Sequence, residues 1–189
     1  MPTAPAGTGH SIYQLKVTLA HSKPPIWRRI QVSADMTLYK LHHVLQIVMR
    51  RDDSHLHQFV VKGDYYGIPA PDWDLDLIDE ETVKLSQLSL GEKAKFIYEY
   101  DFGDSWEHQI AVEKILPPDP SLKHPLCIKG KNASPPEDCG GIWGYYEMLE
   151  AVQNPAHPEH DHWAEWLEEG FDPAAFDIED INQRLKKLK

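Results

Sequence analysis

The stretch 95-KFIYEYDFGDSWEHQIAVEKI-115 decides the fold, because it repeats one alternating pattern on both sides of a turn signal. Large side chains occupy every second position before and after Gly103-Asp104-Ser105, at Phe96, Tyr98, Tyr100, His108, Ile110 and Val112. Such alternation is typical of strands with one buried face. Two strands that flank a Gly-Asp turn predict a long β-hairpin.

The length of the hairpin loop sets which residues face one another. A shift of the pairing by one residue turns every side chain to the opposite face, so a two-residue loop would separate the two buried sets. We therefore expect an odd-length loop, with Tyr98 opposite Ile110 and Tyr100 beside His108. His108 then lies on the core side.

The segments before this hairpin predict a second hairpin and a helix. Residues 12–20 and 26–32 alternate as strands around a proline turn. Thr37 is placed to cap a helix whose apolar side chains recur at steps of three and four as far as Val48. Residues 57–62 form a further strand.

The segments after the hairpin predict a loop and then helices. Residues 117–141 are rich in proline and glycine and are expected to form a long ordered loop. Helical patterns follow at residues 144–152 and 158–170, and a last helix begins after Asp177.

This order of elements predicts an α+β fold. We expect a β-grasp-like mixed sheet, built from a hairpin, a helix and further strands that include the long hairpin, with C-terminal helices. The chain has 189 residues, of which 41% are hydrophobic and 26% charged, and that composition excludes disorder for its body. Residues 11–189 are expected to form a single domain, and residues 1–10 a disordered tail.

The bulk properties limit the partners and the compartment. A formal net charge of −11 repels nucleic-acid phosphate, so nucleic acid is not an expected partner. No apolar run is long enough to span a membrane, and two cysteines do not make a disulfide framework. We expect a cytoplasmic protein without membrane contact. The paired Arg28-Arg29 and Arg50-Arg51 are interpreted as solvated surface.

The string Tyr100–His108 gathers carboxylates, a hydroxyl and an imidazole at one hairpin tip. Such groups bind divalent ions or transfer protons. The alternative is structural, with Asp104 holding loop amides and Asp101 paired with Arg28 or Arg29. The sequence leaves both interpretations open.

Two other groups give weak metal signals. Cys127, Cys139 and His124 lack the Cys-x-x-Cys spacing of a closed zinc site. Five histidines are interpreted as surface residues: His55, His57, His157, His160 and His162. We therefore expect no metal site and no cofactor.

Four stretches resemble the plasmid pRiA4b Orf-3-like family: residues 25–29 (PIWRR), 100–108 (YDFGDSWEH), 135–141 (PPEDCGG) and 171–177 (FDPAAFD). The resemblance implies an uncharacterised family found on plasmids and beside mobile elements. It picks out ten signature residues: Trp27, Arg28, Arg29, Asp101, Asp104, Trp106, Glu107, His108, Glu137 and Asp138. Relatives often have a cysteine where this chain has Ser134, so a metal site in relatives would be incomplete here.

The leading hypothesis is a binding module, in which the ten signature residues form one hollow for a small polar ligand or a protein or peptide partner. The first alternative is a metal-dependent hydrolase acting on nucleic acid or a phosphoester, with its ion held by Asp101, Asp104, Glu107 and His108. The second alternative is an accessory protein of transposition that acts through partners. Whether the protein is an enzyme is left open.

Overall fold

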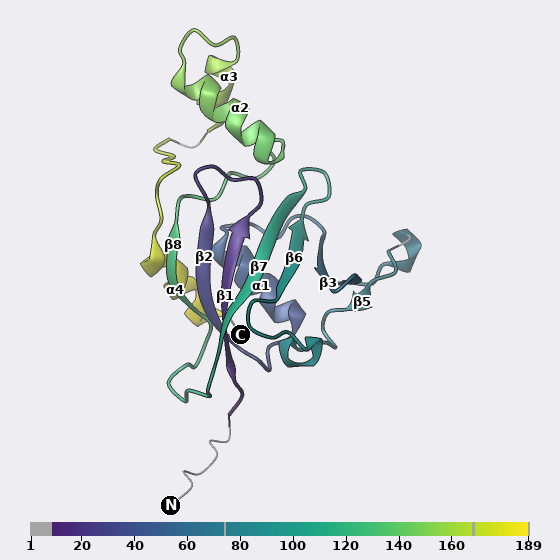
Figure 1. Cartoon of the computed structure of the whole chain (residues 1–189). Coiled ribbons are helices and arrows are strands. Elements are labelled where there is room, and N and C mark those ends of the chain that lie inside the picture. The colour runs from purple at the N-terminus through teal and green to yellow at the C-terminus, as the bar shows by residue number, and fades with distance from the viewer. Residues whose placement is uncertain (1–8, 74, 168, 189) are drawn as a thin grey trace, which may run out of the picture.

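A single mixed sheet forms the centre of the molecule (Figure 1). The computed structural model describes residues 9–73, 75–167 and 169–188. Within these residues the sheet has eight strands in the order β5-β4-β3-β6-β7-β1-β2-β8. The strands are β1 (Ile12–Leu19), β2 (Trp27–Ser33), β3 (His57–Val61), β4 (Asp64–Gly67), β5 (Ile78–Asp79), β6 (Lys95–Tyr100), β7 (Trp106–Leu116) and β8 (Leu126–Lys131). Neighbouring strands are antiparallel except for β4 and β5, and the expected α+β class with a mixed sheet is confirmed.

Helix α1 (Leu38–Val48) covers one face of the sheet (Figure 1). Thr37 caps it as predicted, because its hydroxyl accepts a hydrogen bond from the Lys40 amide at 3.2 Å. The apolar side of α1 packs on the buried side chains of β1, β2, β6 and β7 in one core cluster. On the opposite face of the sheet, side chains such as Lys16 and Glu99 are only partly buried.

Three further helices follow the sheet: α2 (Gly141–Gln153), α3 (His160–Trp166) and α4 (Ile178–Lys187). Figure 1 shows α2 and α3 beyond one end of the sheet and α4 beside β8. The predicted cap is confirmed, since the Asp177 carboxylate accepts from the Asp180 amide at 3.0 Å. Helix α2 begins three residues before the predicted start at residue 144, at a pair of glycines. No helix in the described part of the chain is long and apolar enough to cross a membrane.

The hairpin of β6 and β7 has the predicted sidedness but not the predicted pairing. Tyr98 faces His108 and Tyr100 faces Trp106, so the register differs by two residues from the expected one. The turn begins at Asp101, whose φ is 60° and whose carboxylate accepts from the amide of Gly103 at 3.0 Å. This side-chain turn ends β6 at Tyr100, and residues 101–105 form the loop.

Strand β8 lies inside the segment predicted to be a loop, and that prediction is wrong. The outer edge of β8 is hydrogen-bonded to a side chain instead of another strand. The Asn182 amide of α4 donates to the Cys127 carbonyl at 2.8 Å, and its oxygen accepts from the Cys127 amide at 2.8 Å. The pattern of residues 126–131 alone is too short and too polar to predict this strand.

The predicted disordered tail falls mostly on residues 1–8, which lie outside the described residues.

Candidate functional site

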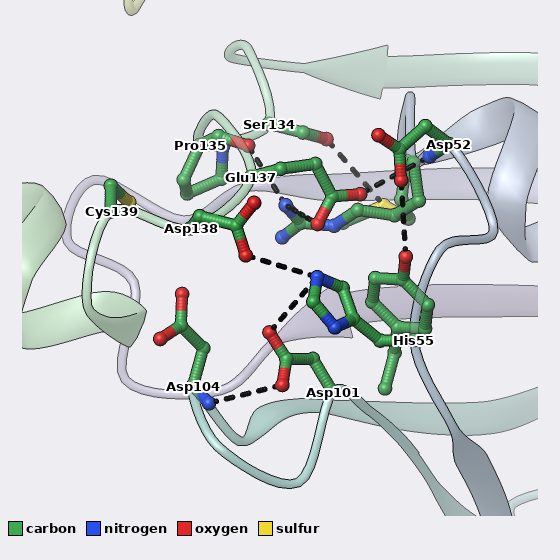
Figure 2. A network of polar contacts seen from close by, with 12 residues as sticks. Asp52, His55, Asp101, Asp104, Ser134, Pro135, Glu137, Asp138 and Cys139 are labelled. Carbon is green, nitrogen blue, oxygen red and sulfur yellow. Dashed lines mark hydrogen bonds and ion pairs between the residues drawn. The ribbon is translucent and has the colours of Figure 1, made fainter.

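Three signature residues, Trp27, Arg29 and Glu107, lie on the face of the sheet opposite α1. Arg29 donates from Nε and Nη2 to both oxygens of Glu113, at 2.6 and 2.8 Å. The Trp27 ring lies under the cations of Lys16 and Arg29, at 4.9 and 5.1 Å. Glu107 is exposed, and none of the three takes part in the polar network of Figure 2. The structure does not bring them into one hollow with the acidic turn.

Arg28 is buried in the core with an exposed fraction of 1%, so its interpretation as solvated surface is wrong. Nε donates to the Val48 carbonyl at 2.8 Å, and Nη1 donates to the carbonyls of Trp27 and Lys131 at 2.8 and 3.0 Å. The Phe176 ring lies 4.7 Å from the guanidinium carbon. Burial lowers the pKa of Arg28 to about 10. The ion pair of Arg28 with Asp101, which the structural interpretation of the hairpin tip offered, is not formed.

Arg51 is a second buried arginine, and the surface interpretation is wrong for it too. Its guanidinium lies 4.3 Å from the ring of Trp106, which is fully buried. Nη1 donates to the Pro135 carbonyl at 3.0 Å, and the carboxylate of Glu137 lies 4.0 Å away. Burial lowers the pKa of Arg51. Burial also lowers the pKa of the fully buried His108 to about 3, and Arg51 adds to this effect.

Several buried polar atoms around Arg51 lack a hydrogen-bond partner within the described part of the chain. They are Nε and Nη2 of Arg51, Nε2 of His55, Nε1 of Trp106, Nε2 of His108 and Oε2 of Glu137. Most buried polar groups in folded proteins have a hydrogen-bond partner. A group of neighbouring buried atoms without one therefore marks a candidate functional site.

Beside Arg51, three segments bring a histidine and two aspartates together (Figure 2). His55 precedes β3, Asp101 begins the hairpin turn, and Asp138 precedes α2. The Nε2 atom of His55 lies 3.6 Å from the nearer oxygen of Asp101 and 3.0 Å from that of Asp138. We call these three residues the His-Asp cluster. Asp104 and Glu137 lie around it in Figure 2.

A cleft of about 630 Å³ opens next to this cluster. One wall is the segment 133–137, and the other comes from residues 166–177. Among the lining residues, five are arginine or aromatic and four are acidic: Arg28, Arg50, Trp166, Phe171, Phe176, Asp52, Glu137, Asp172 and Asp177. Because Glu137 and Asp52 also take part in the network of Figure 2, the cleft and the network share one wall.

A second polar network lies under α1, and it corrects the surface interpretation of His57. The His57 ring is buried, and its Nε2 lies 3.0 and 2.9 Å from the two oxygens of the fully buried Glu80. It stacks on the His42 ring at 3.5 Å. His42 contacts the Tyr98 hydroxyl through Nδ1 at 2.8 Å and Asp53 through Nε2 at 2.7 Å. Burial lowers the pKa of His42 to about 4.

The two cysteines are not metal-ligand candidates, although Cys139 lies beside Asp138 in Figure 2. Cys127 is in β8 and Cys139 precedes α2; both are buried and free. Burial raises the pKa of their thiols to about 11 and about 12. Neither belongs to the two groups of metal-ligating side chains found in the described part of the chain.

Sequence reasoning missed His55 and Arg51 as site residues. Both were taken as surface, because nothing near them in the sequence shows which segments pack on them. The one available signal was the paired Arg50-Arg51 after an apolar helix, which a solvated helix end explains equally well.

A family model described as plasmid pRiA4b ORF-3-like protein matches residues 11–180. The chain belongs to this family. The match includes all ten signature residues and confirms the resemblance noted in the sequence.

Two relatives of this pRiA4b ORF-3-like protein extend the comparison. An uncharacterized protein, y4hQ, of Sinorhizobium fredii strain NGR234 is 38% identical over 180 residues, which are 94% of this chain and 92% of that protein. The crystal structure of MM3350, a protein of unknown function from Methanosarcina mazei Go1, is 40% identical, with a TM-score of 0.83. The matched region covers 92% of this chain and 98% of the MM3350 chain. The fold and nearly the whole length are therefore shared.

Proposed function

We propose that the protein is a binding module that holds a small anionic ligand, a carboxylate or a phosphomonoester, in the cleft beside Arg28. The observation that carries the proposal is the unpaired charge of Arg28. No carboxylate in the described part of the chain lies within ion-pair distance of its guanidinium. Buried charges are normally paired, because an isolated charge loses its hydration without compensation.

The hydrogen bonds of Arg28 leave room for a ligand. Its bonds to carbonyl groups satisfy N–H donors but carry no opposite charge. Nη2 makes a single long contact of 3.4 Å with the Ser134 hydroxyl, and both residues line the cleft. An anionic group near Nη2 would supply the missing counter-charge and a short hydrogen bond.

The four acidic residues of the cleft form no ion pair with Arg28, and each accepts a hydrogen bond from a backbone amide. Asp177 caps α4, and Asp172 accepts from the Ala174 amide at 2.9 Å. Glu137 accepts from the Asp52 amide at 3.1 Å. The aromatic rings of the opposite wall provide the apolar contact area that ligand sites usually have.

The alternative of a metal-dependent hydrolase is less well supported by these contacts. Its four ligands would be Asp101, Asp104, Glu107 and His108, but Glu107 is exposed while His108 is fully buried on the core side. Successive strand residues point to opposite faces, so these two cannot hold one ion. Action through plasmid- or transposon-encoded partners stays a prediction that no contact favours.

The proposal is tested by thermal unfolding with a panel of small carboxylates and phosphomonoesters. A ligand at a hundred times its Kd stabilises the folded protein by about 2.7 kcal/mol. The variant Ala175→Trp places a large ring at an exposed position of the cleft and should remove this stabilisation. The matched control Ala164→Trp changes an exposed residue of α3 outside the cleft and should keep it.

Two results would contradict the proposal. Either no anion of the panel raises the unfolding temperature, or the increase persists unchanged in Ala175→Trp.

A further inference from the structure

We propose that the His-Asp cluster is a binding site for a divalent transition-metal ion, Mn²⁺ or Zn²⁺, with His55, Asp101 and Asp138 as its protein ligands. The inference goes beyond the binding function proposed above and does not depend on it. One ligand atom from each residue lies within 4.8 Å of the others. The three come from segments far apart in the sequence, so the fold assembles the cluster.

Asp101 is held so that one of its oxygens stays free for an ion. Its Oδ1 accepts from the amides of Gly103 and Asp104, at 3.0 and 3.3 Å. Oδ2 accepts no hydrogen bond within the described residues and faces His55. The Asp101 residue is only 7% exposed, and its amide donates to the Leu56 carbonyl at 2.8 Å, which ties the turn to the segment of His55.

The imidazole of His55 offers a nitrogen that no neighbour satisfies. Its Nε2 is buried and lies close to two carboxylate oxygens, yet neither contact has the geometry of a hydrogen bond. The nitrogen is therefore left without a hydrogen-bond partner among the described residues, close to both carboxylates, and is available to a metal ion. The ring is steadied by an edge contact with Tyr100 at 5.7 Å.

A close approach of the hairpin turn to the start of α2 sets the position of Asp138. Gly140 and Gly141 have positive φ angles of 89° and 71°. A Cβ atom on Gly141 would collide with the backbone of Asp104, so only glycine permits the contact. The Asp104 carboxylate accepts from the Gly140 amide at 3.2 Å and fixes the two segments together. This contact places Asp138 opposite Asp101 across His55.

The separations suit a transition-metal ion. With metal–ligand bonds of about 2.1 Å, neighbouring ligand atoms lie ~3.0 Å apart in an octahedral site and ~3.4 Å apart in a tetrahedral one. The two separations from His55 Nε2 are 3.0 and 3.6 Å. These two separations are close to those of a metal site, and the third, between the two carboxylates, is within 4.8 Å.

The surrounding charge and the donor types select the class of ion. The carboxylates of Asp52, Asp104 and Glu137 lie around the cluster (Figure 2), and the nearby cation is Arg51, 4.0 Å from the Glu137 carboxylate. One imidazole with two carboxylates suits Mn²⁺ or Zn²⁺ better than Ca²⁺, which takes oxygen ligands alone. Three protein donors leave positions for water or a ligand.

A second group, His42, His43 and Asp53, has a similar composition, but His42 has no nitrogen free to bind a metal ion. Both ring nitrogens of His42 are already engaged, by Tyr98 and Asp53. It serves as the internal control.

The test is calorimetric titration of the chelator-treated full-length protein with Mn²⁺, Zn²⁺ and Mg²⁺, together with elemental analysis of the bound metal. The decisive variant is Asp138→Asn, because that side chain is 68% exposed and its loss leaves the core intact. The matched control is His43→Ala, which removes a ligand of the second group.

We expect one Mn²⁺ or Zn²⁺ per chain, binding at least tenfold weaker in Asp138→Asn and unchanged in His43→Ala. Circular dichroism and unfolding curves must show that Asp138→Asn keeps the fold; if it does not, His55→Gln replaces it. The absence of heat and of bound metal in the parent protein would overturn the proposal, since a protonated His55 bridging the two aspartates would then account for the cluster. Undiminished binding in Asp138→Asn, or binding lost in His43→Ala, would overturn it as well.

Discussion

Acid should destabilise this protein through His108, whose imidazole is fully buried and has no contact with solvent. Burial, with a contribution from Arg51, lowers the pKa of His108 from its usual 6.5 to about 3. The unfolded chain therefore binds a proton at a pH where the folded protein does not. The stability linked to His108 is complete above pH 6.5 and decreases as the pH falls toward 3.

The size of this effect follows from the two pKa values. Each unit of pKa difference corresponds to about 1.4 kcal/mol, so the linked loss at pH 5 is about 2 kcal/mol. Full protonation below the lower value would cost about 5 kcal/mol, a large share of the ~5–15 kcal/mol by which domains are stable.

The measurement compares urea unfolding of the parent protein and of His108→Gln at pH 7 and pH 5. Glutamine has no charge to gain and can still donate to the Tyr98 carbonyl, which lies 3.3 Å from His108 Nδ1. The parent should lose about 2 kcal/mol more than the variant between the two pH values. The control is His162→Gln, an exposed histidine of α3, which should keep the full loss of the parent. If His108→Gln shows the same pH dependence as the parent, the reasoning is refuted.

Two predictions concern contacts that hold the fold. Asn182→Ala should lower the free energy of unfolding by about 1–3 kcal/mol in urea denaturation, because two hydrogen bonds to the edge of β8 are lost. Gln183→Ala, an exposed neighbour in α4, should change it by less than about 0.5 kcal/mol, and equal effects would contradict the role of Asn182. Gly141→Ala should lower the free energy of unfolding by at least the ~1–2 kcal/mol of left-handed strain, and with it the unfolding temperature, because the new Cβ meets the hairpin turn. Gly91→Ala adds a Cβ in open space and should be near neutral, so a mild Gly141→Ala would argue against the close approach.

The elements with strong local patterns were predictable from the sequence. Helix α1 follows from an apolar stripe and the Thr37 cap, and β1, β2, β6 and β7 follow from alternation. The sidedness of the long hairpin also followed, because one buried face allows only one parity. Its register did not, because the side-chain turn of Asp101 ends the strand, and alternation carries no information about that.

The candidate site depended on the tertiary structure. Hydrophobicity and periodicity are properties of neighbouring residues, so the sequence by itself determined the class of fold, the main elements and the acidic surface. The burial of Arg28 and Arg51 and the meeting of His55 with Asp101 and Asp138 depend on segments that are distant in the chain. The position of a charged side chain in the sequence does not show what surrounds it in the folded protein. Only the packing of those segments decides whether it faces water, an opposite charge or an ion.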